Sequence, residues 1–186
     1  MASVVVPFRA ASAKRRLEPL DEDVRSDLAH VMLVDVLAAA TFVGPTILVT
    51  ERDAERARAL AAVRGVEVVD DPGRGQGAAV AAGLAAAPEW PVVVVNADLP
   101  GVQPRDLLAL LGAMPEDGIA IVPARDGTTN ALALARPGLF EPLYGPGSAT
   151  RFRAHAEELG VEVAELAVSA LALDVDTVAE LVHITP

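Results

Sequence analysis

Four consecutive valines at residues 92–95 constrain the fold of this chain more than any other feature. A strand that is apolar on both faces is typical of a parallel sheet with helices covering each side. The run ends in the polar sequence NADLP, which places Asn96 and Asp98 just before Pro100. The sequence therefore predicts a buried strand that delivers a carboxylate at its carboxyl end.

Strand-like and helix-like patterns alternate along the chain. The expected strands cover residues 3–7, 46–50, 66–69, 92–95, 119–123, 131–135, 161–165 and 171–175. The expected helices cover residues 23–40, 54–63, 78–87 and 104–111, with another ending near Gly160 and a last one starting at Thr177. This alternation predicts an α/β fold with a mostly parallel sheet. No linker or repeat divides the chain, so residues 1–186 are expected to form a single domain.

Composition narrows the functional classes. Hydrophobic residues make up 52% of the 186 residues and aromatic residues only 3%, so the core is expected to be aliphatic. The absence of cysteine excludes disulfides, thiolate metal sites and cysteine nucleophiles. A net charge of −11 argues against a general nucleic-acid binder. No signal peptide or membrane span is expected, which predicts a soluble, cytoplasmic protein.

Two aspartates are candidate metal ligands. Ligands of open α/β sheets bind at the carboxyl ends of the strands, where Asp98 is expected. Asp174 lies in an apolar segment, LALDVDT, and a carboxylate there needs a cation or donors to offset its desolvation. Asp98 alone fits a turn, whereas Asp176 precedes a helix-capping pattern of Thr177 and Glu180. Together, Asp98 and Asp174 could hold Mg²⁺, which prefers oxygen ligands.

Two loops could hold phosphates. A basic loop with Arg9, Lys14 and Arg16 follows the first strand and could bind a nucleoside triphosphate. The sequence DDPGRGQG, with Gly75 and Gly77, leads into a helix whose start could receive an anion. Taken singly, the first loop fits a solvated turn better than a binding site, and the second fits a tight connection better.

Two further loops carry polar groups. RDGTTNAL places Asn130 at a strand, and YGPGS places Gly145 and Ser148 before a helix. Each fits ordinary turn chemistry by itself. In combination with the two aspartates and the basic loop, they predict a Mg²⁺-dependent transfer between phosphates that needs no protein nucleophile.

In these segments the chain resembles the phosphoenolpyruvate and 2-phospho-L-lactate guanylyltransferases of deazaflavin coenzyme F-420 biosynthesis. The similarity covers nearly the whole length. Its most specific pieces are AKRRL (13–17), ADLP (97–100), RDGTTNAL (125–132), YGPGS (144–148) and ALDVDT (172–177). The resemblance implies a single-domain, Rossmann-like nucleotidyltransferase fold of the GT-A-like kind. It also implies GTP and Mg²⁺, and attack by the acid's phosphate on the α-phosphorus of GTP with loss of pyrophosphate.

The resemblance also implies roles for residues. Asp98 and Asp174 correspond to the metal carboxylates and Lys14 to a catalytic lysine. Asn130, Gly145 and Ser148 correspond to contacts with the acid, the last two chiefly through backbone N–H groups. The residues that correspond to nucleotide contacts are Arg9, Lys14, Arg16, Gly75 and Gly77.

The chain departs from the family pattern at four positions. Arg9 replaces a common lysine, and Arg15 replaces a serine or threonine. Gly77 stands where an asparagine is usual, and Phe152 where a histidine often follows Arg151. The last two departures concern contacts with the base and the face of the helix.

Other functions remain open from the sequence. A molybdenum-cofactor guanylyl- or cytidylyltransferase is one, although its early glycine-rich loop is replaced here by PFRAASAKRRL. A non-catalytic nucleotide-binding or partner-binding homologue is another. Among the acids, phosphoenolpyruvate is favoured because the Ala/Val/Arg-rich composition resembles actinobacterial chains. A homodimer and a transient coupling to the downstream transferase are hypotheses about partners, and neither nucleic acid nor a membrane is expected as one.

Overall fold

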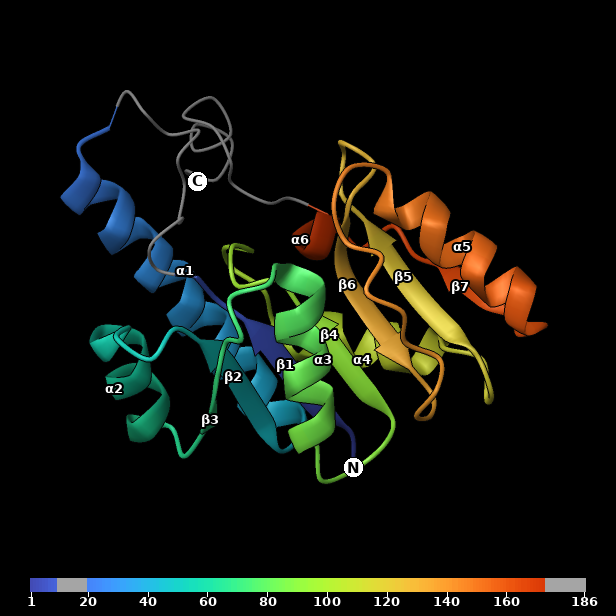
Figure 1. Cartoon of the computed structure of the whole chain (residues 1–186), viewed down its shortest axis with the longest axis horizontal. Helices are drawn as coiled ribbons and strands as arrows, with labels where there is room; N and C mark the ends of the chain where they lie inside the picture. Colours follow the sequence, from blue (N-terminus) through green and yellow to red (C-terminus); the bar gives the residue numbers. More distant parts are fainter. Residues whose placement is uncertain (10–19, 173–186) are drawn as a thin grey trace.

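The computed structural model describes residues 1–9 and 20–172 (Figure 1). The strands are β1 (Ser3–Pro7), β2 (Thr46–Thr50), β3 (Glu67–Asp70), β4 (Val92–Val95), β5 (Ile119–Pro123), β6 (Thr129–Leu134) and β7 (Val163–Glu165). The helices are α1 (Glu22–Val43), α2 (Glu55–Val63), α3 (Gln76–Ala86), α4 (Pro104–Ala113), α5 (Ser148–Leu159) and α6 (Ser169–Ala172). Strands and helices alternate up to β5, as the sequence pattern predicts.

These strands form one sheet in the order β3-β2-β1-β4-β6-β5-β7. The first four in this order are parallel to one another, β6 is antiparallel to both of its neighbours, and β7 is parallel to β5. The valine run is β4, which pairs with β1 through Val93 and Val4 and with β6 through Val95 and Ala131. All four valines are buried. The mostly parallel α/β sheet expected from the sequence is therefore confirmed.

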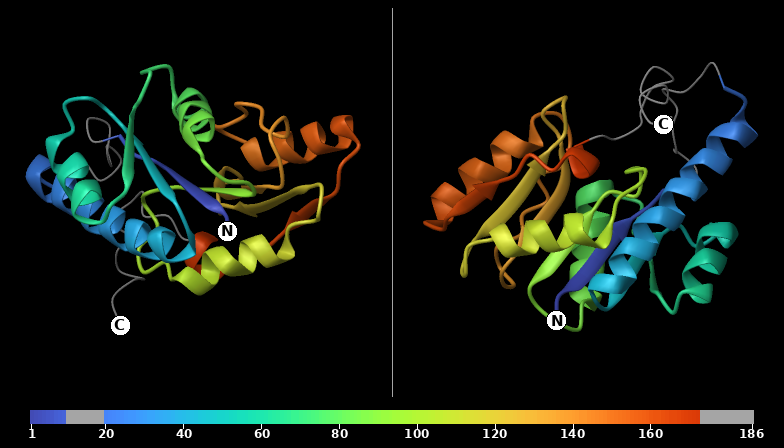
Figure 2. Two further views of the ribbon diagram at one scale, coloured as in Figure 1. Left: turned by 90° about the horizontal axis from the view of Figure 1, so that it is seen from below. Right: turned by 180° about the vertical axis from the view of Figure 1, so that it is seen from behind.

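Helices cover both faces of the sheet (Figure 2). Val4 and Val6 of β1 pack in one apolar cluster with residues of α1, α2, α4 and α6. Val5, on the opposite face, packs with residues of α3 and α5. Alternate side chains of a strand point to opposite faces, so the two clusters are the two cores of a three-layer sandwich.

Close packing places α3 against the sheet. A Cβ added to Gly83 of α3 would lie 2.4 Å from Cγ1 of Val5 and 2.9 Å from Cγ2 of Val49. Only glycine permits this approach without moving the strands. The packing of α3 against one face of the sheet thus sets the position of the helix start at Gln76.

Three expectations from the sequence need correction. A strand was expected at residues 171–175, but Leu171 and Ala172 lie in α6, where their N–H groups bond to the Val168 carbonyl in a helical turn. Residues 173–175 and the helix expected from Thr177 lie outside the described residues. β6 begins at Thr129 rather than residue 131, because Thr129 still pairs with Pro123 beyond a register shift.

The third correction concerns α1. Contrary to the expectation that no segment would qualify, α1 is long and apolar enough to cross a membrane by length and composition, with a mean hydropathy of 1.6 over a stretch of 18 residues. Half of this stretch is buried within the fold, where Leu33 and Val36 pack in the core. A core helix passes the same test, so the finding is weak evidence for a membrane segment.

Candidate active site

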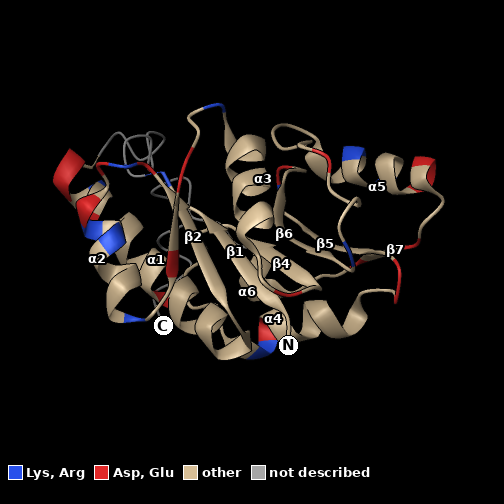
Figure 3. Cartoon of the chain, turned by 60° about the horizontal axis from the view of Figure 1, so that its bottom comes forward, with Lys and Arg blue, Asp and Glu red and all other residues tan. Residues whose placement is uncertain are grey.

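Polar segments converge at one edge of the sheet. β1, β2, β3 and β4 are parallel, so their carboxyl ends lie together, and the antiparallel β6 starts at the same edge. The strands β1, β2, β4, β5 and β6 contain no charged residue, and the charges lie on helices, in loops and at strand ends (Figure 3). This edge is where an open α/β sheet binds its ligands.

Asp98 lies two residues beyond β4, at this edge. Its neighbours Ala97 and Leu99 are buried in the core, which anchors the segment on both sides of the half-buried carboxylate. The segment is also tied to α1, because the N–H of Gly101 donates to Oδ2 of Asp35 at 3.3 Å. The predicted partner Asp174 lies outside the described residues. Within residues 1–9 and 20–172, no group of three or more His, Asp or Glu side chains could hold a metal.

Arg9 forms an ion pair at the start of the glycine-rich loop. Its Nε donates to Oδ2 of Asp71 at 2.8 Å, and Oδ1 of Asp71 accepts the N–H of Gly73 at 2.8 Å. Desolvation by burial would raise the pKa of Asp71, but the hydrogen bonds from Arg9 and Gly73 outweigh it and lower the pKa. The hydrogen bond to Asp71 raises the pKa of Arg9. The first loop and the glycine-rich loop are thereby joined, whereas Lys14 and Arg16 lie outside the described residues.

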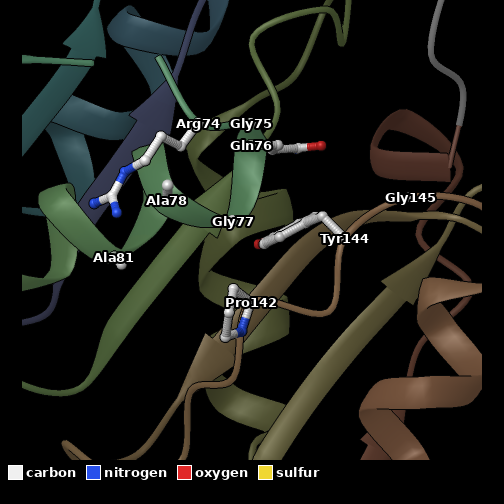
Figure 4. Close-up of a pocket in the computed structure, with 9 residues that line it drawn as sticks. All are labelled: Arg74, Gly75, Gln76, Gly77, Ala78, Ala81, Pro142, Tyr144 and Gly145. Atoms are coloured by element: carbon white, nitrogen blue, oxygen red, sulfur yellow. The ribbon is translucent and has the colours of Figure 1, made fainter. Parts of the chain in front are cut away.

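A pocket of about 590 Å³ lies between the start of α3 and the loop that precedes α5 (Figure 4). The residues that line it are Arg74, Gly75, Gln76, Gly77, Ala78, Ala81, Pro142, Tyr144 and Gly145. A Cβ added to Gly77 would lie 2.6 Å from Cβ of Pro142 and 3.1 Å from its carbonyl oxygen. Glycine at this position therefore lets the two walls meet. The structure brings Gly75 and Gly77 of DDPGRGQG together with Gly145 of YGPGS, two motifs that lie far apart in the sequence.

A chain of side-chain amides connects the pocket to the sheet. Nε2 of Gln76 donates to Oδ1 of Asn96 at 2.7 Å. Nδ2 of Asn96 donates to Oδ1 of Asn130 and to the Thr129 carbonyl, each at 3.3 Å. Their backbones pair as well, since the N–H of Asn96 donates to the Asn130 carbonyl at 2.9 Å. Residues from α3, from β6 and from the segment that follows β4 are thus held in one network, two residues before Asp98.

The predicted acid-binding residues Asn130 and Ser148 are buried. Asn130 is 1% exposed and Ser148 is fully buried. The Ser148 hydroxyl donates to Oγ1 of Thr129 at 3.0 Å, so it is directed into the protein interior. The Ser148 N–H donates to the Gly145 carbonyl at 3.0 Å. Both donors of Ser148 are therefore engaged within the protein, and of the two loop residues only Gly145 lines the pocket.

Arg151 holds the loop that carries Gly145. Its Nη2 donates to the carbonyls of Leu143 at 2.7 Å and Tyr144 at 3.2 Å. Its Nη1 donates to the Pro146 carbonyl at 2.5 Å, and its Nε also donates to Leu143. One guanidinium thus fixes the backbone at three loop positions, Leu143, Tyr144 and Pro146, on both sides of Gly145.

Sequence reasoning missed five residues at this site: Arg74, Gln76, Asn96, Tyr144 and Arg151. Each lies inside or beside a segment already noted, because Arg74 and Gln76 belong to DDPGRGQG and Tyr144 begins YGPGS. Proximity to those motifs was the available signal. The amide chain and the arginine clamp could not be predicted from spacing, because their partners are 5 to 34 residues apart.

The fold and the site define an α/β nucleotidyltransferase: a mostly parallel sheet, a carboxylate after a central strand, and a pocket beside a glycine-rich helix start. The chain belongs to the family described as guanylyl transferase CofC like, whose model matches residues 2–185. It is therefore a member of an enzyme family, and nothing in the comparisons favours a molybdenum-cofactor transferase or a non-catalytic homologue.

Three curated relatives illustrate the family. Phosphoenolpyruvate guanylyltransferase of Streptomyces coelicolor is 38% identical, over 96% of this chain and 87% of the relative. 2-Phospho-L-lactate guanylyltransferase of Natrialba magadii is 39% identical, over 97% of this chain and 82% of the relative. 3-Phospho-D-glycerate guanylyltransferase of Phenylobacterium zucineum is 34% identical, over 99% of this chain and 89% of the relative. The resemblance inferred from the sequence motifs is confirmed.

Solved structures support the fold. A putative nucleotide-diphospho-sugar transferase of Desulfovibrio desulfuricans superposes with a TM-score of 0.78 at 18% identity, over 97% of this chain and 85% of that one. A nucleotidyl transferase of Methanothermobacter thermautotrophicus superposes with a TM-score of 0.70 at 20% identity, over 99% of this chain and 95% of that one. At these identities the likeness concerns the fold alone.

Proposed function

We propose that this enzyme joins GTP to a phosphorylated three-carbon acid, phosphoenolpyruvate in the first place, and releases pyrophosphate. An oxygen of the acid's phosphate attacks the α-phosphorus of GTP in line. A new P–O bond forms there, the bond to the β-phosphate oxygen breaks, and pyrophosphate leaves with its electron pair. The product is a guanosine diphosphate ester of the acid.

One observation carries this proposal. In a chain of a guanylyltransferase family, the pocket between Gly77 and Gly145 brings the loop assigned to the nucleotide against the loop assigned to the acid. Two substrates bound on facing walls would have their phosphates close together, and proximity of this kind supplies much of the acceleration in phosphoryl transfer. The volume of about 590 Å³ lies within the range of small-molecule sites.

The chain's own residues would bind and orient the substrates. Arg74 at the mouth of the pocket, with Arg9, Lys14 and Arg16, would attract and hold the triphosphate. Gly75 and Gly77 line the same pocket at the start of α3 and would contact the nucleotide, since a helix start favours negative charge. Gly145 would hold the acid through the loop backbone, together with Ser148 and Asn130.

Mg²⁺ fits the donor set at the edge of the sheet. Asp98 offers a half-buried carboxylate beside an amide network, and the described residues near it offer oxygen ligands rather than sulfur. Asp98 and Asp174 would hold the ion. When bound, it would neutralise charge on the phosphates and on the leaving pyrophosphate.

The choice of acid and the cellular setting belong to the same proposal. The relatives act on three different acids that vary by a double bond, a hydrogen pair or a hydroxyl, differences that a pocket discriminates only modestly. Phosphoenolpyruvate is favoured because relatives from Streptomyces coelicolor and Sphaerobacter thermophilus carry that name. We place the reaction in the cytoplasm, in deazaflavin coenzyme F-420 biosynthesis, with transient transfer of the product to the next transferase and a homodimer as the working assembly.

Pyrophosphate release tests the proposal. The purified chain is incubated with GTP, Mg²⁺ and, separately, phosphoenolpyruvate, 2-phospho-L-lactate or 3-phosphoglycerate. The downstream transferase and its deazaflavin acceptor are present to remove the product. We expect release that depends on GTP and Mg²⁺ and is fastest with phosphoenolpyruvate. Silence with all three acids, from protein that is folded by circular dichroism, would refute the proposed reaction.

A further inference from the structure

Tyr144 presents its hydroxyl to the pocket. It is the single tyrosine of the chain and lies in the loop that precedes α5. Figure 4 shows the ring between the two walls of the pocket, with its oxygen directed toward Gly77 at the start of α3. The residue as a whole is partly buried. The hydroxyl is therefore a polar group at the point where the two loops face each other.

The ring is fixed from behind. It packs edge-on against Phe152 of α5, with ring centroids 5.4 Å apart, and lies 6.4 Å from the ring of Phe140. Arg151 holds the Tyr144 carbonyl and that of the preceding Leu143. Because packing and hydrogen bonds restrict both the ring and its backbone, the hydroxyl position is preorganised rather than mobile.

The hydroxyl has no structural role among residues 1–9 and 20–172. In this part of the chain it makes no hydrogen bond to another residue, and the aromatic contacts involve only the ring. Burial raises the pKa of Tyr144, so the group stays protonated and can donate at any physiological pH. A phenylalanine would provide the same packing, which leaves the hydroxyl available for a ligand.

The surroundings favour the nucleoside part of a nucleotide over its phosphates. Beside the hydroxyl, the pocket is lined by Ala78, Ala81 and Pro142, which offer apolar surface, and Arg74 is its one charged lining residue among residues 1–9 and 20–172. A base or ribose buries apolar area against such walls and still needs a polar partner at its edge. A triphosphate alone would require more cationic lining.

We infer that Tyr144 is a nucleotide-binding residue whose hydroxyl forms a hydrogen bond with the base or ribose of GTP. This assignment rests on the proposed function for the identity of the nucleotide. It adds a contact from the loop otherwise assigned to the acid, so that one loop would contact both substrates.

The variant Tyr144→Phe tests the inference by removing only the hydroxyl. Isothermal titration with GTP in the absence of acid measures binding without turnover. We expect the Kd for GTP to rise about three- to tenfold, the range of one lost hydrogen bond. The Kd for inorganic triphosphate, the KM for the acid and the melting temperature should stay unchanged. Phe140→Leu is the matched control, since it alters ring packing in the same loop and leaves the hydroxyl in place.

Each outcome is decisive. An unchanged Kd for GTP overturns the inference. An equal loss for inorganic triphosphate places the hydroxyl on the phosphates and also overturns it, as does a rise confined to the KM of the acid. If the wild type binds GTP but transfers it to none of the three acids, the proposed reaction fails while the binding comparison still tests Tyr144. If the wild type binds no GTP, both the proposed reaction and the assignment of Tyr144 are refuted.

Discussion

The Ser148 hydroxyl donates a hydrogen bond to Oγ1 of Thr129 across 3.0 Å, and both residues are buried. This bond joins the start of α5 to the start of β6, which are the two elements that carry the predicted acid-binding residues. The serine of the YGPGS motif is therefore part of the support of the site. Its side chain does not point into the pocket.

Ser148→Ala should affect stability more than substrate binding. We expect the free energy of unfolding to fall by about 1 kcal/mol, because one buried hydrogen bond is lost. The KM for the acid should rise less than about threefold, since a backbone contact survives the substitution. Urea denaturation and steady-state kinetics measure the two effects. Thr129→Ser, which keeps a hydroxyl at the other end of the bond, is the control. A tenfold rise in KM with unchanged stability would show that the serine hydroxyl contacts the acid.

Asp98→Asn should abolish turnover and leave the fold intact. Loss of a carboxylate from the metal site removes charge that is needed in the transition state, so kcat should fall by about a hundredfold or more. The melting temperature should change little. Asp117→Asn is the matched control, because Asp117 is an exposed partner of Arg136 that precedes β5, away from the carboxyl edge. Wild-type turnover in Asp98→Asn would remove Asp98 from the metal site.

Asp71→Asn should destabilise the protein at neutral pH and much less in acid. The pKa of Asp71 is lower in the folded state, so its contribution is fully present above the unfolded pKa of about 3.9 and is lost as the pH falls through the folded value. At pH 7 we expect a loss of about 1 kcal/mol, at the low end for a charged hydrogen bond because Arg9 is 37% exposed. Urea unfolding of both proteins at pH 7 and pH 3 measures the difference.

Arg9→Gln is the companion variant for this ion pair. It breaks the same bond from the other side. The loss of unfolding free energy in the double variant should therefore not exceed the sum of the losses in the two single variants. A stability difference between wild type and Asp71→Asn that is the same at both pH values would contradict the ion-pair explanation.

Gly77→Ala should destabilise the pocket although alanine normally favours a helix. The added Cβ would meet Cβ of Pro142 at 2.6 Å and its Cα at 3.0 Å, and neither atom can move without its loop. We expect a loss of about 1–3 kcal/mol and a higher Kd for GTP. Gly112→Ala in α4 is the control, because a Cβ there has open space and should leave stability equal or raise it by up to about 1 kcal/mol. Equal behaviour of the two variants would refute the contact.

Arg151→Lys should loosen the loop that carries Gly145. An ammonium group cannot reach the carbonyls of Leu143, Tyr144 and Pro146 at once, whereas the guanidinium does. We expect faster hydrogen exchange at residues 143–149, measured by mass spectrometry, and a KM for the acid raised about threefold or more. Arg153→Lys on the same helix is the control, since Arg153 pairs with Glu165 and Thr150 on the surface. Unchanged exchange in Arg151→Lys would show that the clamp is dispensable.

The sequence by itself determined the architecture and located the polar segments that the structure brings to one edge of the sheet. The valine run, the alternation of elements and the polar residues after Val95 follow local rules of periodicity and strand chemistry, which act over a few residues and can be read without a structure. The glycine-rich loop and YGPGS were recognised in the same way. The register at Thr129 and the helical turn at Leu171 were missed, because pairing and packing with distant strands decide such boundaries.

Only the tertiary structure decided which groups face the pocket. Ser148 turns inward because Thr129 lies beside it, and Asn96 is held between Gln76 and Asn130 because β4 pairs with β6. Gly77 is required by Pro142, which lies 65 residues further along the chain. These relationships depend on how the loops pack at the edge of the sheet. Side-chain direction and contact distance are properties of that packing, and local sequence spacing does not specify them.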